Sequence, residues 1–343
     1  MPVFLVRLLW LFRHWNETIY KVLCVACLLL LAACSSDVQE LHETRFMMGT
    51  LVAFTVMGVD KKQAQQAVVA AANEMQRVED AFTIYGSAEN DVKRFNHTAV
   101  RQLFPLNMEV SELLQTALDI QQKSEGAFNP ALGALNQLWG FSQTPPPTKP
   151  PSDKVIAERR EGLDDCLRHR QAGWWRLSEQ CQLDFGGIAK GYAIDRGIEV
   201  LKKHGVHDAM INAGGDIRLI GQHGDKPWRI GVRDPREEKK MLAILQLQGD
   251  VSIVTSGDYE RFFMYHDKRY HHILDAGTGY PSMQSQSVTV IASTATLADA
   301  WSTALFVAGA SALKLADKYH LQILRVDVKG NVSRSKPLRG LVQ

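Results

Sequence analysis

The stretch Asp184–Asp195, DFGGIAKGYAID, says most about the fold and chemistry of this chain. An apolar run leads into Asp184, two glycines follow, and Lys190 lies in the first turn of a helix predicted over 189–204. This order predicts a strand-to-helix turn that approaches a ligand closely, with open amides and a cation, as a phosphorylated ligand requires. The spacing supports neither a Rossmann fingerprint nor a P-loop. A purely structural glycine-rich turn is the alternative.

Outward from this turn, the sequence predicts many short strands with a few helices between them. Strands are predicted at 50–57, 209–212, 217–221, 228–232, 243–248, 251–255, 270–274, 287–291 and 321–326, and helices at 61–81, 110–124, 152–160, 189–204, 296–307 and 312–319. Successive strands with segregated helices favour an α+β fold over a doubly wound α/β fold.

The N-terminus has the layout of a secretion signal. Basic residues precede an apolar run over 22–33, which is too short to span a bilayer comfortably. The run ends in Leu-Ala-Ala-Cys, which resembles a bacterial lipobox with Cys34 as the lipidated, palmitate-bearing residue. We expect a lipoprotein signal peptide over 1–33, a polar tether over 34–43 and the folded domain over 44–343. A plain N-terminal anchor helix is the alternative.

Ser35 follows the predicted lipidated cysteine. This residue resembles the outer-membrane sorting pattern of Gram-negative lipoproteins. The resemblance implies a periplasmic protein that its lipid attaches to the membrane, and the sorting pattern implies the outer membrane.

The composition excludes a nucleic-acid partner. Lys and Arg number 39 and Asp and Glu 37, for a formal net charge of +2, and the chain without 1–33 is formally neutral. Such a balance predicts neither a nucleic-acid footprint nor an electrostatic membrane patch. With 45% hydrophobic and 22% charged residues, the chain is typical of globular proteins.

Two cysteines remain beyond the leader. Cys166 and Cys181 flank the segment 174–177, which is predicted as half of a hairpin. In an oxidising compartment the two could pair, and the alternative is two separate buried thiols. No Cys/His spacing in the chain suits zinc.

Two glycine-containing segments carry further candidate chemistry. The segment 256–263, SGDYERFF, predicts a turn after a strand with Asp258 as an exposed acid. The segment 270–281, YHHILDAGTGYP, runs from a short strand with His271 and His272 into a glycine-rich turn. Taken alone, paired histidines of this kind are typical of structural positions.

The third segment, 293–303, contains Asp299 and Thr303. If Thr296 caps the helix, Asp299 lies in its first turn, where Asp is commonly a capping-box residue. The other interpretation is that Asp299 and Thr303, four residues apart, share one helix face. Together with the backbone carbonyl of Gly187 they would form an all-oxygen site suited to magnesium.

Five of these segments, in order, resemble the ApbE family of FAD:protein FMN transferases, and the resemblance extends from about residue 44 to 326. The segments are Met48–Thr50, Asp184–Asp195, Ser256–Tyr259, His272–Pro281 and Ala298–Thr303. The resemblance implies a two-lobed fold with mixed or antiparallel sheets, flanking helices and an active site between the lobes.

The resemblance also implies a reaction. FMN would pass from FAD to a Ser or Thr hydroxyl of an acceptor flavoprotein, with magnesium as cofactor and AMP as leaving group. The implied acceptor is a subunit of a membrane redox complex, NqrC- or RnfG-like. The family pattern assigns magnesium to Gly187, Asp299 and Thr303, and FAD to Met48, Tyr85, Ala127, Phe128, Asn129, Asp184, Lys190 and Ile273.

The acceptor hydroxyl must lose a proton in this reaction. His272 and Asp258 are the candidate bases, and His272 is favoured because the unperturbed pKa of histidine lies near neutrality. One alternative is an FAD pyrophosphatase, in which water replaces the acceptor hydroxyl. The other is a periplasmic flavin-binding lipoprotein without turnover.

Overall fold

The computed structural model describes residues 40–336 and 338. The predicted signal peptide and the predicted lipid site at Cys34 therefore lie outside the described residues. Among the described residues, no helix combines the length and the apolar character that a membrane span requires.

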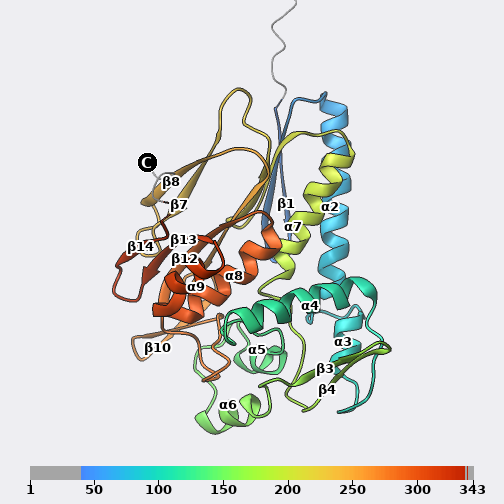
Figure 1. Ribbon diagram of the computed structural model, residues 1–343, viewed down its shortest axis with the longest axis vertical. Helices are drawn as coiled ribbons and strands as arrows, with labels where there is room; N and C mark the ends of the chain where they lie inside the picture. Colours follow the sequence, from blue (N-terminus) through green and yellow to red (C-terminus); the bar gives the residue numbers. More distant parts are fainter. Residues whose placement is uncertain (1–39, 337, 339–343) are drawn as a thin grey trace, which may run out of the picture. The chain divides into compact units, whose positions relative to one another are not determined.

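An antiparallel sheet of eight strands forms the centre of the fold (Figure 1). Along the sheet its strands are β1 (Glu40–Met47), β2 (Thr50–Met57), β5 (Asp208–Ala213), β6 (Asp216–Ile220), β9 (Val251–Gly257), β12 (Ser285–Ala292), β13 (Gln322–Asp327) and β14 (Val332–Arg334). Three hairpins lie outside it: β3 (Leu167–Arg170) with β4 (Gly173–Arg176), β7 (Trp228–Arg233) with β8 (Met241–Leu247), and β10 (Phe262–Tyr265) with β11 (Lys268–His271).

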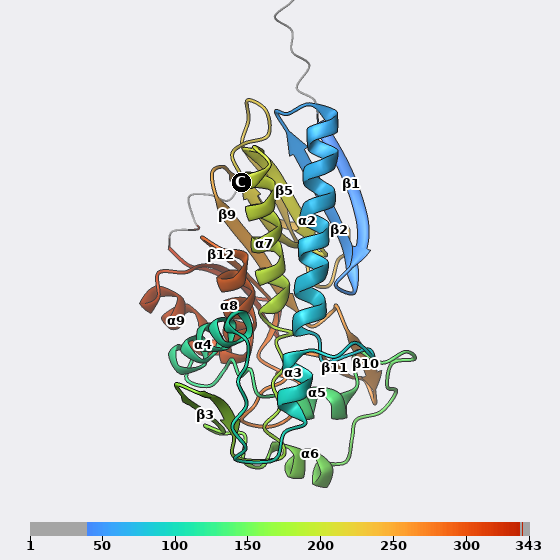
Figure 2. The same ribbon diagram turned by 90° about the vertical axis from the view of Figure 1, so that its right-hand side faces the viewer.

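Three long helices cover one face of this sheet (Figure 2). They are α2 (Lys61–Phe82), α7 (Ala189–Lys203) and α8 (Ala295–Ala308). The side of α2 that the sequence predicts as apolar is buried against α7 and the sheet, and Met75 and Val78 on this side are 0% exposed. On the other face, apolar residues of β7 and β8 such as Trp228 and Leu245 pack against the sheet in a second cluster.

The remaining helices lie near one end of these three (Figure 1). They are α3 (Asp91–Asn96), α4 (Met108–Lys123), α5 (Gly133–Trp139) and α6 (Asp153–Arg160), with the 3₁₀ turn η1 (Gly309–Ser311) and α9 (Ala312–Lys318) beside α8. A third apolar cluster joins α5 and α6 to the β10–β11 hairpin through Trp139, Ile156 and Phe263. The indole of Trp139 donates a hydrogen bond of 2.8 Å to the carbonyl of Gly279.

The predicted α+β class is confirmed, and all pairs of named strands among the described residues are antiparallel. The open question about the cysteines is also answered, because Cys166 and Cys181 form a disulfide. The short elements α5, β10 and β14 were not predicted, since none of them has an apolar pattern long enough to show a period.

Two predicted boundaries are wrong. The predicted tether over 34–43 overlaps the structure, because Glu40–Glu43 form the first half of β1 and pair with β2. As an edge strand with one exposed side, β1 carries alternating polar residues that look like a tether. The predicted cap Thr296 is not the cap of α8, because Thr294 has an extended backbone and its hydroxyl accepts the N–H of Leu297.

Candidate active site

The glycine turn before α7 satisfies most of its own amides. The N–H of Gly186 donates to Asp184 Oδ1 at 2.8 Å, and the N–H groups of Ile188 and Ala189 both donate to the carbonyl of Phe185. Within 186–189, only the N–H of Gly187 has no acceptor among the described residues. The cradle of open amides is therefore smaller than the sequence predicts, because the turn folds back on Asp184 and Phe185.

Gly187 lies directly against α8. A Cβ at this position would lie 3.4 Å from the Oγ1 of Thr303 and 3.1 Å from the ring of Phe128. A side chain here would crowd both neighbours, so glycine lets the backbone come this close. The structure thus brings the backbone of Gly187 to the hydroxyl of Thr303, as the predicted magnesium site requires.

Gly191, one turn into α7, brings Asp299 to the same place. A Cβ on Gly191 would lie only 2.2 Å from the carbonyl oxygen of Ala295 and 2.8 Å from the Cβ of Asp299. The N–H of Gly191 donates to Asp299 Oδ2 at 2.9 Å. Asp299 therefore joins α8 to α7, and it is not the capping-box residue of its own helix.

The carboxylate of Asp299 is in an environment that favours a cation. Asp299 is only 4% exposed. Burial, together with the charge of Asp216, raises the pKa of Asp299 to about 7, although Lys190 opposes the shift. A bound cation would reverse this effect, because an opposite charge favours the ionised carboxylate.

Lys190 lies beside this carboxylate but has its own partner. Its ammonium group is 2.7 Å from Oδ2 of Asp216, which is 2% exposed at the start of β6. Burial opposes the charge of Lys190, but Asp216 and Asp299 together raise its pKa. Lys190 is therefore held protonated at the start of α7, as the family pattern at this position implies.

Hydroxyl groups surround the proposed ligand set. Ser256 Oγ on β9 lies 2.7 Å from Ser302 Oγ and 3.3 Å from Thr303 Oγ1. Ser302 also donates to the backbone carbonyl of Asp299 at 2.9 Å. Ser256 and Ser302 were not predicted as site residues, although both belong to segments that the sequence analysis singled out.

These residues fit a magnesium ion better than a transition metal. No trio of His, Cys, Asp and Glu within the part of the chain that the structure describes is arranged to hold a metal. The available donors are one carboxylate, on Asp299, the hydroxyl of Thr303 and the carbonyl of Gly187. Magnesium prefers such oxygen ligands, takes few of them from protein and completes its shell with water and phosphate oxygens.

Met48 occupies the tight turn between β1 and β2. Its φ of 53° and that of Gly49, 68°, are both positive, as a two-residue hairpin turn requires. The N–H of Met48 donates to Glu79 Oε2 of α2 at 2.8 Å, which supports this uncommon backbone for methionine. The turn therefore has a defined place at the end of the sheet edge.

The charge of Asp184 acts on the phenol of Tyr85. Tyr85 is 43% exposed, and burial followed by the charge of Asp184 raises the pKa of its phenol. Asp184 accepts hydrogen bonds from Gly186 and, at 2.6 Å, from the side chain of Asn136 on α5. Burial raises the pKa of Asp184 despite these bonds.

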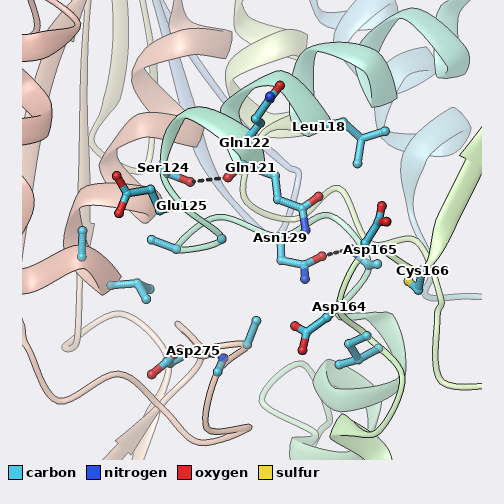
Figure 3. A pocket seen from close by; sticks show the side chains of 18 of the residues that line it. Leu118, Gln121, Gln122, Ser124, Glu125, Asn129, Asp164, Asp165, Cys166 and Asp275 are labelled. Atoms are coloured by element: carbon cyan, nitrogen blue, oxygen red, sulfur yellow. Dashed lines mark hydrogen bonds between the residues drawn. The ribbon is translucent and has the colours of Figure 1, made fainter.

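The segment 127–129 separates the glycine turn from a cavity of about 810 Å³. Phe128 is buried and faces Gly187, whereas Ala127 and Asn129 line the cavity. Figure 3 shows Asn129, Asp164 and Asp275 around this space. The residues that line the cavity include neither Lys190 nor the proposed magnesium ligands, so the predicted magnesium site lies outside this cavity.

His272 presents an uncharged imidazole. Its Nδ1 is buried without a hydrogen-bond partner among the described residues. The backbone N–H of His272 donates to the backbone carbonyl of Arg261 at 3.1 Å. Burial, followed by the charges of His271, Arg261 and Lys190, lowers the pKa of His272 to about 3. The near-neutral pKa for which the sequence analysis favoured His272 over Asp258 is therefore wrong, because the buried site disfavours the charged imidazole. The next residue, Ile273, is 5% exposed and belongs to the main core.

Asp258, the other candidate base, is not the exposed acid that the sequence predicts. It is 7% exposed, and Arg236 binds both of its oxygens, at 2.7 and 2.6 Å. Arg269 contacts the same carboxylate at 3.3 Å. Asp258 thus connects the loop before β8 with the β10–β11 hairpin, and both of its carboxylate oxygens are engaged.

A model of the ApbE family matches residues 48–324. A relative from Rhodobacter capsulatus named FAD:protein FMN transferase is 33% identical over 80% of this chain, which spans 53% of that protein. A relative of the same name from Haemophilus influenzae is 30% identical over 93% of this chain and 96% of its own length.

A solved structure gives the same result for the fold. The crystal structure of the ApbE protein from Thermotoga maritima aligns with a TM-score of 0.81 and 32% identity, over 89% of this chain and all of that one. The family match, the relatives and the shared architecture agree with the five segments that carry the resemblance. The chain belongs to the ApbE family.

Proposed function

We propose that this protein transfers the FMN part of FAD to a Ser or Thr hydroxyl of an acceptor flavoprotein and releases AMP. The observation that carries the proposal is the meeting of Gly187, Asp299 and Thr303 beside the protonated Lys190. Family membership and the names of the relatives support the same reaction.

The atoms of this reaction balance without any oxidant or reductant. The acceptor oxygen forms a bond to the phosphorus that stays with the flavin, and the bond from that phosphorus to the AMP oxygen breaks. The hydroxyl proton passes to a base, and His272 is the candidate because its Nδ1 has no hydrogen-bond partner among the described residues, although its lowered pKa makes it a weaker base than a free imidazole. Lys190 offers a fixed positive charge to the diphosphate.

Magnesium would be held by Asp299, Thr303 and the carbonyl of Gly187. Bound there, it would neutralise charge on the diphosphate oxygens. Phosphoryl transfer requires mainly positioning and charge neutralisation. The close packing of the glycine turn and α7 against α8 would position these ligands.

The test uses the chain from Ser35 onward with FAD, magnesium and a candidate acceptor domain. AMP release and the mass of the acceptor are followed together. We expect AMP together with an acceptor that gains the mass of FMN. AMP with free FMN and an unmodified acceptor would instead indicate a pyrophosphatase, and bound flavin without AMP would indicate a binding protein.

The location and partner belong to the same proposal. We infer that Cys34 carries the lipid, including palmitate, and that the protein is attached to the periplasmic side of a membrane. The acceptor would be an NqrC- or RnfG-like subunit of a membrane redox complex. In cells labelled with palmitate, the chain should incorporate label and sediment with membranes, whereas a Cys34→Ala variant should do neither.

A further inference from the structure

Arg261 lies in the same segment, 256–263, as Ser256 and Asp258, and it contacts the predicted site residue His272. Its backbone carbonyl accepts the N–H of His272 at 3.1 Å, so the two residues are fixed to one another. Its guanidinium donates to Ser142 Oγ at 3.1 Å through Nη1. Through Nη2 it approaches the β1–β2 turn, where a Cβ on Gly49 would lie 2.9 Å away. Glycine at position 49 thus leaves room for the guanidinium.

The charge of Arg261 is not compensated as that of Lys190 is. Lys190 is paired with Asp216, but among the described residues no carboxylate lies within ion-pair distance of Arg261. After burial, which is the main cause, Arg261 contributes to lowering the pKa of His272, and it also acts on Tyr85. Its positive charge therefore reaches both the candidate base and a predicted FAD contact.

We propose that the guanidinium of Arg261 binds the phosphate of FAD that stays with the flavin. This inference rests on the proposed function. The base must approach the acceptor hydroxyl that attacks this phosphate, and the backbone of Arg261 is bonded to that of His272. A guanidinium can bind two phosphate oxygens at once, and only one of its N–H groups is taken up by Ser142. Lys190 and the proposed magnesium ligands belong to the glycine turn, α7 and α8.

The test measures affinities of Arg261→Gln and Arg261→Lys for parts of FAD, without acceptor. FAD, FMN and riboflavin are titrated by flavin fluorescence, and AMP by displacement of FAD. We expect Arg261→Gln to weaken FAD and FMN by about 10- to 100-fold, the usual effect of losing a charge-assisted hydrogen bond. Riboflavin and AMP should be unaffected. Arg261→Lys should give an intermediate loss, because an ammonium group cannot make the paired contact.

Arg229→Gln serves as the matched control, since Arg229 is exposed on β7 in a hairpin outside the site. It should leave every affinity unchanged, and thermal melting of all variants checks their folding. Equal losses for riboflavin and FAD, or a loss for AMP in place of FMN, would overturn the assignment of Arg261. Failure of the wild type to bind FAD would instead contradict the proposed function, so the two failures are distinguishable.

Discussion

Burial determines the charge of single side chains around this site. The carboxyl of Asp299 and the imidazole of His272 both shift toward their neutral forms, and burial is the main cause for each. Lys190 keeps its charge because two carboxylates outweigh the same effect. The site thus combines a fixed cation, a neutral base and a carboxyl that needs a counter-ion.

The base can be tested by His272→Asn. We expect this variant to lose transfer by at least about 100-fold, the usual range for loss of a general base, while FAD affinity changes little. The wild-type rate should also not fall from pH 7 to pH 5 through protonation of His272, since its pKa is about 3. Acceptor mass and flavin fluorescence provide the two readouts. Normal transfer by the Asn variant would eliminate His272 as the base.

The same pKa shift predicts an effect on stability. A histidine whose pKa falls on folding binds fewer protons in the folded state, so its contribution is complete above the unfolded pKa near 6.5 and is lost as pH falls toward 3. Urea unfolding at pH 7 and pH 5 measures this. We expect the wild type to lose up to about 2 kcal/mol more than His272→Asn between these values. An equal loss in both proteins would contradict the shift.

At the level of elements, Asp195 of α7 sets the start of α8. Its carboxylate accepts the N–H groups of Ala295 at 2.8 Å and Thr296 at 2.9 Å, and the hydroxyl of Thr296 at 2.5 Å. It also pairs with the buried Arg218. Asp195 therefore performs the anchoring that the sequence analysis gave to a helix cap, and it places the two predicted magnesium ligands of α8.

This role predicts a large effect of Asp195→Ala. The change removes the carboxylate that accepts the N–H groups of Ala295 and Thr296, and it takes from the buried Arg218 one of its carboxylate partners. We therefore expect a loss of about 3 kcal/mol in the free energy of unfolding. Asp250→Ala is the matched control, since Asp250 also pairs with Arg218 but its side chain is 43% exposed. That variant should lose less than about 1 kcal/mol. Equal losses in chemical denaturation would argue against the anchoring role.

The sequence predicted elements best where their pattern is long. The helix over 61–81 and the strand over 50–57 correspond to α2 and β2 because each has a continuous apolar period. Strand β1 was missed because its exposed side is polar. The cap of α8 was placed two residues late, at Thr296 in place of Thr294, because two threonines lie at its start and only backbone conformation tells which one caps.

The site shows the same limit. Spacing alone could suggest that Asp299 and Thr303 share a face, and the structure adds Gly187 against them. No pattern indicated that Arg236 would occupy Asp258, or that Arg261 would reach the β1–β2 turn, because these contacts join segments far apart in sequence. Pairings of this kind follow from tertiary packing and not from local preference.

For the whole molecule, the disulfide offers the clearest stability test. Cys166 and Cys181 are separated by 15 residues, and a crosslink over such a loop stabilises by about 3 kcal/mol in the chain-entropy model. We expect the double serine variant to lose about this amount in denaturant unfolding, and the wild type to lose a similar amount in reductant. No change under reduction would mean that native packing alone determines stability in this region.

The contact between Gly191 of α7 and Ala295 of α8 joins two segments that the ribosome makes about 100 residues apart. Along the sequence, the residues proposed to act on FAD range from the β1–β2 turn, early in the described residues, to α8, late in them. A nascent chain that has not yet delivered α8 has its lysine and its glycine turn but lacks Asp299 and Thr303. The active site should therefore form only after α8 has been made and has packed against α7. Incomplete chains should not cleave FAD.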